Sequence, residues 1–183
     1  MKRNRVAAIG LLIATTCTSR ASIAAGSNLL PNGTFDTDLS GWTGNGPWCS
    51  GTSGGVCWTP VDVDDSPSSG SALLKATRPF YPVMTLTSEC IPVTGGDDYV
   101  LDLFVRGGGP LVEASPYWFT DSACQSTGRL ETDVIEPGLG IWTHSRRVFA
   151  APGDVVAVRV LLRAREPAYP YFDNVRLHHV IPG

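Results

Sequence analysis

The sequence predicts an all-β fold, a jelly-roll β-sandwich of about nine or ten antiparallel strands. Three observations lead to this prediction. Apolar and polar residues alternate along most of the chain, helical periodicity is absent after the first residues, and turn-forming residues separate the alternating runs. Each of these is typical of short strands that have one face buried.

The alternating runs can be assigned one by one. In Asp98–Arg106 every second residue from Tyr99 to Val105 is apolar, which places these side chains on one face of a strand. Turns rich in Gly and Pro separate the runs, for example residues 94–97 and 151–154. The expected strands after the N-terminal segments are Ser71–Arg78, Val83–Val93, Asp98–Arg106, Glu113–Thr120, Thr143–Ala150, Asp154–Arg163 and Tyr171–Val180.

Residues 1–24 are expected to be a cleaved export signal. A basic start at residues 2–5 precedes a short apolar run at residues 6–14, and a small-x-small motif ends at Ala24, with cleavage after Ala25 as the alternative. Residues 25–183 then form a single domain of 159 residues. We expect it to be secreted, periplasmic or at the cell surface, without membrane insertion.

The charge argues against nucleic acid and anionic membranes as partners. The signal contains four basic residues and no acidic one, so its removal changes the formal charge from −3 to −7. An acidic domain is repelled by phosphate backbones and by anionic bilayers. We therefore expect no nucleic-acid partner, and we expect a monomer.

The cysteine count predicts two disulfides. Cys17 lies in the signal, and Thr16 before it differs from the Gly or Ala of a lipoprotein signal. The other four are an even number in an exported chain, which is typical of disulfides. Three pairings are possible; we favour Cys49–Cys57 with Cys90–Cys124, because Cys49 and Cys57 flank a Gly-rich turn. A four-cysteine zinc site is the alternative, but no Cys-x-x-Cys pair occurs.

Segments at both ends of the predicted domain resemble a known family. Residues 28–36 are NLLPNGTFD, residues 171–177 are YFDNVRL, and residues 89–106 between them are ECIPVTGGDDYVLDLFVR. In this order they resemble the opening strand, closing strand and middle hairpin of the CenC-like carbohydrate-binding modules of families 4, 9 and 22. These are galactose-binding-domain-like jelly rolls. The resemblance implies that the opening and closing strands are neighbours.

The resemblance also implies a structural calcium ion. The usual side-chain ligands in the family correspond to Asp36 and Asp173 here, while Asn174 stands where the family often has a second carboxylate. Backbone carbonyls would supply further oxygen ligands, which suits calcium. The alternative is that Asp36 caps a turn and Asp173 makes a hydrogen bond. The acidic residues of segment 61–65 could bind a cation, but we favour their interpretation as a solvated loop.

Aromatic residues are the main candidates for binding carbohydrate, because flat apolar rings pack against the C–H faces of sugars. Trp42 and Trp142 match family positions that pack in the core. Trp48 and Trp58 flank the proposed Cys49–Cys57 loop. The predicted carbohydrate-binding residues are Trp48, Trp58, Tyr81, Trp118 and Arg106, with Glu113 and Arg163 as further possible partners of sugar hydroxyls.

The predicted function is a non-catalytic module that binds polysaccharide or a cell-surface glycan. The sequence has three histidines and no recognisable motif for a nucleophile, a catalytic metal or a phosphate loop. One alternative is a structural or adhesive jelly roll without a sugar site. Modules of the resembled family are usually attached to a catalytic domain, and we expect none in this sequence. The other is a glycoside-active enzyme; with 17 acidic residues some carboxylate pair always exists, so this signal is unspecific.

Overall fold

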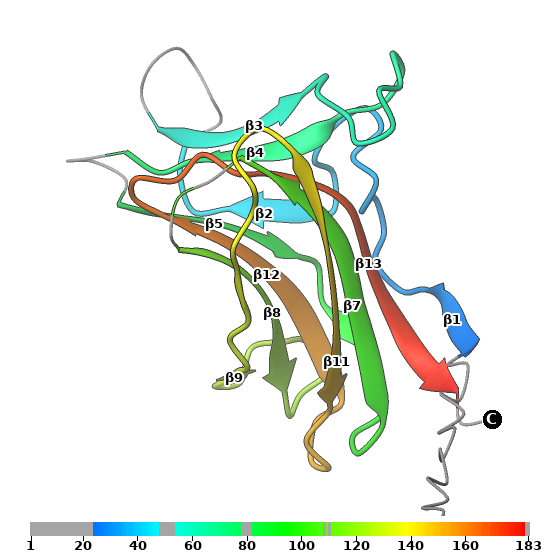
Figure 1. Ribbon diagram of the computed structural model, residues 1–183. Coiled ribbons are helices and arrows are strands. Elements are labelled where there is room, and N and C mark those ends of the chain that lie inside the picture. The colour runs from blue at the N-terminus through cyan, green and yellow to red at the C-terminus, as the bar shows by residue number, and fades with distance from the viewer. Residues whose placement is uncertain (1–23, 48–53, 78–81, 108, 110, 182–183) are drawn as a thin grey trace, which may run out of the picture.

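The computed structural model describes residues 24–47, 54–77, 82–107, 109 and 111–181. Within these residues the chain forms two antiparallel β-sheets, here called sheet A and sheet B, and no helix. Figure 1 shows the two sheets lying against each other as a sandwich. Among the described residues there is accordingly no apolar helix of a length that could cross a membrane.

Sheet A has the strand order β11-β7-β13-β4-β3, with β1 beside β13. Its strands are β1 (Ala24–Asn28), β3 (Gly55–Thr59), β4 (Ser71–Lys75), β7 (Asp98–Arg106), β11 (Trp142–Ala150) and β13 (Tyr171–Ile181). Sheet B has the order β10-β8-β12-β5-β2, with β6 beside β12 and β9 beside β8. Its strands are β2 (Trp42–Gly44), β5 (Val83–Ser88), β6 (Ile91–Pro92), β8 (Val112–Phe119), β9 (Arg129–Leu130), β10 (Val134–Ile135) and β12 (Ala157–Arg165). From β7 onward the long strands alternate between the sheets, which is the crossing pattern of a jelly roll.

The structure confirms the all-β sandwich. The described residues form thirteen strands, of which β6, β9 and β10 have only two residues each, so the longer ones agree with the expected number. The predicted strand Val83–Val93 is wrong in extent, because its pairing with β12 shifts by one residue between Thr87 and Ile91, where the hydroxyl of Ser88 accepts the N–H of Val160. β12 begins at Ala157 rather than Asp154, because the N–H of Val155 closes a turn onto the carbonyl of Pro152.

The core lies between the sheets and follows the alternation of the strands. Val158, Val160 and Leu162 of β12 all face it and are buried. Phe35 and Trp42 pack against each other in it, with ring centroids 5.4 Å apart. Trp142, in contrast, is only half-buried and is not part of the main cluster, so its expected place in the core is wrong.

The opening segment lies along the closing strand, as the family resemblance implied. β1 pairs with β13, and after β1 the N–H of Leu29 donates to the carbonyl of Leu177 at 2.8 Å. The side chain of Asn28 accepts the N–H of Leu177 at 3.0 Å. Farther along, the carbonyl of Gly33 accepts the N–H of Val175 at 2.8 Å. Figure 1 shows β1 beside β13 at one end of the sandwich.

One of the two expected disulfides is present in the described part of the chain. Cys90 is bonded to Cys124, which ties the segment after β5 to the loop after β8. Cys57 lies in β3, but Cys49 lies outside the described residues. The Cys49–Cys57 bridge therefore stays a prediction, and it is the pairing that remains for these cysteines once Cys90 and Cys124 are joined.

Candidate functional site

The outer surface of sheet B carries polar and charged side chains from three neighbouring strands. Because alternate residues of β12, β8 and β5 are buried in the core, the residues between them point outward. The sheet B face consists of Glu113, Ser115 and Tyr117 from β8, Arg159, Leu161 and Arg163 from β12, and Thr85 and Thr87 from β5. In register, Arg163 lies opposite Glu113, Leu161 opposite Ser115 and Arg159 opposite Tyr117.

The sheet B face is recessed, although it lies outside the sandwich core. Only 4% of Glu113 and 1% of Ser115 are exposed. The loop after β8 covers one end of the face, where Phe119, Cys124 and Ala157 form a second, small apolar cluster. Beside this cluster is a hollow of about 360 Å³, lined by Thr87, Tyr117, Phe119, Cys124, Ser126, Arg159 and Leu161.

Asp121 shapes the loop that borders this hollow. The hydroxyl and backbone N–H of Ser126, followed by the N–H groups of Gln125 and Ala123, hydrogen-bond the carboxylate and lower the pKa of Asp121 to about 2. The N–H of Ser126 lies 2.6 Å from one carboxylate oxygen. Farther on, Gly128 packs so closely on the ring of Tyr117 that a side chain there would collide with it. The loop thus presents Ser126 to the hollow and supports one side of Tyr117.

A buried ion pair lies at the other end of the sheet B face. Arg163 donates through Nη1 to Oε2 of Glu113 at 2.7 Å, and Nε of Arg165 lies 3.2 Å from Oε1. The side chains of Glu113 and Arg163 are only 5% and 16% exposed. One carboxylate is therefore shared by two guanidinium groups, which leaves a net positive charge. It is the only acidic residue within the strands of sheet B in the described residues.

A second hollow lies at the sandwich edge, between the start of β2 and β3. It measures about 440 Å³ and is lined by Asp38, Leu39, Ser40, Trp42 and Trp58. Trp58 is 38% exposed, and its Nε1–H donates to the carbonyl of Phe35 at 2.7 Å. Backbone and side-chain hydrogen bonds from Ser40 hold the pKa of Asp38 below its usual value. This hollow combines an open indole ring with polar groups, a pattern that suits a sugar.

The three predicted carbohydrate-binding residues that the structure describes, Trp58, Trp118 and Arg106, do not lie together. The prediction that Trp118 binds carbohydrate is wrong. Its side chain is 1% exposed and packs in the core, because β8 turns this ring inward and Tyr117 outward. Arg106 lies on the outer surface of sheet A, level with Trp142 and Tyr171. Trp48 and Tyr81 lie outside the described residues.

Sequence reasoning missed Tyr117, Thr87 and Arg159 as members of one surface. A signal was present in β12, where basic residues at 159, 163 and 165 alternate with buried apolar ones. It indicates one charged face of a strand, but not which strands lie beside it. Glu113 and Arg163, named as possible hydroxyl partners, do lie together.

Asp173, a predicted calcium ligand, is fully buried in β13. Its carboxylate accepts the backbone N–H groups of Val63 at 2.9 Å and Asn174 at 2.6 Å. Burial raises the pKa of Asp173 to about 6; the two hydrogen bonds oppose this shift, and the charges of Asp62 and Asp64 add to it. A buried carboxylate beside two further acidic residues is an environment that an added cation would stabilise.

The segment at residues 61–65 is not the purely solvated loop that the sequence suggested. Asp62 is buried, and its Oδ1 accepts the N–H groups of Asp64 and Ser66 at 2.8 and 2.9 Å. Asp36 is exposed and accepts the hydroxyl of Ser69 at 3.1 Å. Asp36 and Asp173 thus contact the same loop, but in the described part of the chain no three or more His, Cys, Asp or Glu side chains are grouped to hold a metal ion.

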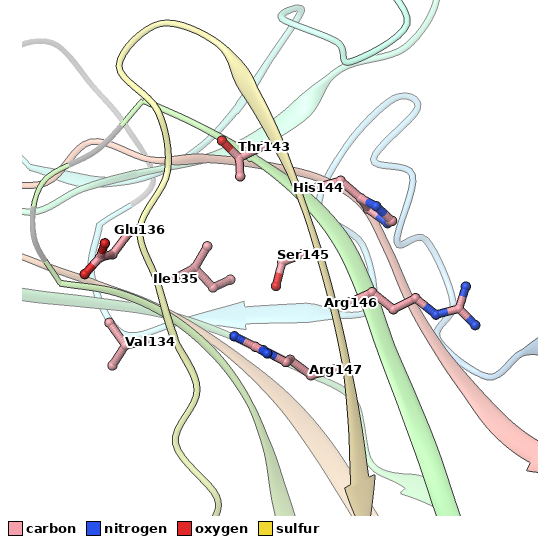
Figure 2. Close-up of a pocket in the computed structure, with 8 residues that line it drawn as sticks. All are labelled: Val134, Ile135, Glu136, Thr143, His144, Ser145, Arg146 and Arg147. Carbon is pink, nitrogen blue, oxygen red and sulfur yellow. The ribbon is translucent and has the colours of Figure 1, made fainter. Parts of the chain in front are cut away.

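A third hollow, of about 330 Å³, lies between the facing edges of the two sheets, at β10 and β11. Figure 2 shows Ser145 and Arg147 directed toward Ile135, whereas His144 and Arg146 point to the other side of β11. Arg147 is paired with Asp133 at 3.3 Å, and His144 with Asp102 at 2.8 Å. Because Arg147 and His144 already have protein partners, this hollow is the weaker candidate for a ligand site.

Comparison with known proteins identifies the fold. No protein-family model matches the sequence, and no curated protein matches it. Among solved structures, a family 16 carbohydrate-binding module matches with a TM-score of 0.57 and 16% identity, over 82% of this chain and 99% of that one. The CBM22-1 xylan-binding domain of Paenibacillus barcinonensis Xyn10C matches with a TM-score of 0.53 and 13% identity, over 88% and 100%.

The same fold also occurs within larger proteins. The enzymatically active domain of bacteriophage CBA120 tailspike protein 4 matches with a TM-score of 0.61 and 17% identity, over 84% of this chain but 21% of that one. Modules of families 4 and 61 match as well. The chain therefore has the jelly-roll fold of carbohydrate-binding modules, including families 4 and 22 of the predicted resemblance.

Proposed function

We propose that this protein is a secreted, non-catalytic module that binds a polysaccharide or cell-surface glycan on the sheet B face. The observation that carries the proposal is the recessed hollow in which the ring of Tyr117 lies beside Arg159, Thr87 and Ser126. An aromatic ring can pack on a sugar ring while the polar groups bond its hydroxyls. The fold adds support, since one structural neighbour is a xylan-binding domain and another was solved with β-1,4-galactotriose.

Binding is favoured over hydrolysis by the carboxylates available on this face. Most glycoside hydrolases use two carboxyl groups about 5–10 Å apart. The described strands of sheet B contain one, Glu113, and two arginines already hold it. The disulfide Cys90–Cys124 suits an oxidising compartment, which agrees with the export signal expected at residues 1–24.

The hollow at Trp58 is a second candidate surface for the same function, and variants separate the two. We expect Tyr117→Ala to weaken glycan binding at least about tenfold, since aromatic anchors commonly contribute 1.4 kcal/mol or more to binding. Trp58→Ala should change binding by less than about threefold, because its ring lies at the sandwich edge. Pull-down on insoluble glucans, xylan, chitin and cell walls finds the polymer, and titration of soluble fragments gives Kd.

Circular dichroism of both variants controls for folding. If Trp58→Ala loses binding and Tyr117→Ala keeps it, the site is the edge hollow and not the sheet B face. If the wild-type protein is retained by no polymer, neutral or acidic, the structural or adhesive alternative replaces glycan binding.

We further propose a structural calcium ion held by Asp173, with Asp36 as the second side-chain ligand. The burial of Asp173 and the nearby charges of Asp62 and Asp64 support it, because a cation would offset their repulsion. Backbone carbonyls would have to complete the coordination, since calcium takes about six to eight oxygens. Bound calcium would join the loop at residues 60–70 to the closing strand.

Calcium removal should lower the melting temperature of the wild-type protein at pH 7, and Asp173→Asn should abolish this response. Without calcium, the wild-type protein should become more stable as the pH falls from about 7 toward 4. The reason is that the folded-state pKa of Asp173, about 6, lies above its ordinary value of 3.8, so folding favours the protonated acid and this stability is lost as the pH rises through 6.

Thermal denaturation with and without chelator, across this pH range, measures both effects. Asp65→Asn, in the same loop and exposed, is the matched control and should keep the calcium response. A melting temperature that is independent of chelator would exclude the calcium proposal.

A further inference from the structure

The hollow on the sheet B face contains a cation without a protein partner. The Nε atom of Arg159 is buried and has no hydrogen-bond partner, and no described residue forms an ion pair with its guanidinium group. Glu89, one residue past β5, is exposed and makes no ion pair with it. A half-buried guanidinium is costly unless an anion bonds it.

The surroundings of Arg159 are organised for a ligand rather than for solvent. Tyr117 lies opposite it in register, and its ring packs against Phe119 with centroids 4.6 Å apart. Thr87 and Ser126 supply hydroxyl groups at the border of the same hollow. The disulfide to Cys90 and the hydrogen bonds of Asp121 hold this border in place before a ligand arrives. A preorganised site of this kind loses less entropy on binding.

The sheet B face also carries an excess of positive charge. Arg163 and Arg165 share the single carboxylate of Glu113, and Arg159 has none. The whole chain, in contrast, has a formal charge of −3. Long-range repulsion of an anionic ligand is screened beyond about 8–10 Å at physiological salt, so contacts inside the hollow decide the affinity.

We propose that the hollow binds an anionic sugar residue, with its carboxylate or sulfate on the guanidinium of Arg159 and its ring against Tyr117. This inference rests on the proposed glycan-binding function and names the ligand class of that site. A planar guanidinium bonds two oxygens of such a group at once through charge-assisted hydrogen bonds, which are stronger than those to the neutral oxygens of hydroxyls or a methyl ester. The ligand is therefore an acidic glycan rather than a neutral one.

The test compares acidic and neutral polymers on the mature protein. Wild-type protein should bind polygalacturonate at least about tenfold more tightly than its methyl ester, since a charge-assisted hydrogen bond is worth about 1.5–3 kcal/mol. Dextran sulfate against dextran tests the sulfate in the same way, so the two pairs identify which anion is recognised. Affinity should fall with added salt.

Arg159→Gln should abolish the preference for the acidic polymer, and Arg159→Lys should keep part of it. Arg176→Gln, an equal loss of charge on the exposed surface of sheet A, should leave it unchanged. Arg159→Gln should melt no lower than wild type, because no protein contact of Nε is lost.

Equal binding of acidic and neutral polymers, unaffected by Arg159→Gln, would overturn this inference and leave the proposed function standing. If the wild-type protein binds none of these polymers and does not bind xylan, both this inference and the proposed function are overturned.

Discussion

Replacing Glu113 with Ala should lower the free energy of unfolding by about 3–5 kcal/mol, because it leaves Arg163 as a buried charge without a partner. For a domain of this size the melting temperature should fall by roughly 10 °C. Arg165 is less affected, since 44% of its side chain is exposed and water can solvate it. Glycan binding should weaken in the same variant, because Arg163 loses the contact that orients it.

A double variant separates the ion pair from simple loss of packing. Replacing Glu113 and Arg163 together with Leu and Met should restore much of the stability, because no buried charge then remains unpaired. Glu136→Ala removes an exposed glutamate from the same protein and should change the free energy of unfolding by less than about 0.5 kcal/mol. Chemical and thermal denaturation measure all three. Wild-type stability of Glu113→Ala would mean that Arg163 is solvated in the folded protein.

Gly33→Ala should be the second most damaging change, although it adds only a methyl group. A Cβ at Gly33 would collide with the backbone carbonyl oxygen of Val175, and backbone in β13 cannot move aside as a flexible side chain can. The hydrogen bond from Val175 to Gly33, 2.8 Å long, would also be strained. We expect a loss of about 3 kcal/mol, at the upper end for overpacked sites, and a melting temperature lower by roughly 6–12 °C.

Gly153→Ala is the matched control. Gly153 is exposed, and a Cβ there would meet no atom within 4 Å, so the free energy of unfolding should change by less than about 0.5 kcal/mol. Equal effects of the two substitutions would show that the opening segment does not pack on β13 as described. Tryptophan fluorescence and circular dichroism during heating distinguish the outcomes.

Much of the fold could be predicted because strand periodicity is a local property. The range of β7 was predicted without error, since Tyr99, Leu101, Leu103 and Val105 recur at every second position and face the core. Where a run was interrupted by a contact with a distant segment, prediction failed. At Ser88 the side-chain hydroxyl, rather than the backbone, accepts the N–H of Val160, a partner far away in the chain. Local alternation contains no information about such a partner.

The candidate site was predicted less well, because aromatic residues on both faces of a strand leave the direction open. Tyr117, Trp118 and Phe119 alternate without showing which ring faces the core. Packing decided it: Trp118 lies against Tyr99 in the core, with centroids 5.9 Å apart. The residue predicted to bind sugar is therefore buried, and its neighbour Tyr117 lines the hollow.

The amino-acid sequence alone predicted an all-β sandwich from its periodicity and neighbouring opening and closing strands from short family-like motifs. The cysteine count predicted disulfides, and among three possible pairings it favoured the one that contains Cys90–Cys124. The tertiary structure alone decided that Arg159 is left without a partner while Arg163 and Arg165 share Glu113. The physical reason is that the cost of a charge depends on its burial and its neighbours, and on the sheet B face those neighbours come from strands that are far apart in sequence.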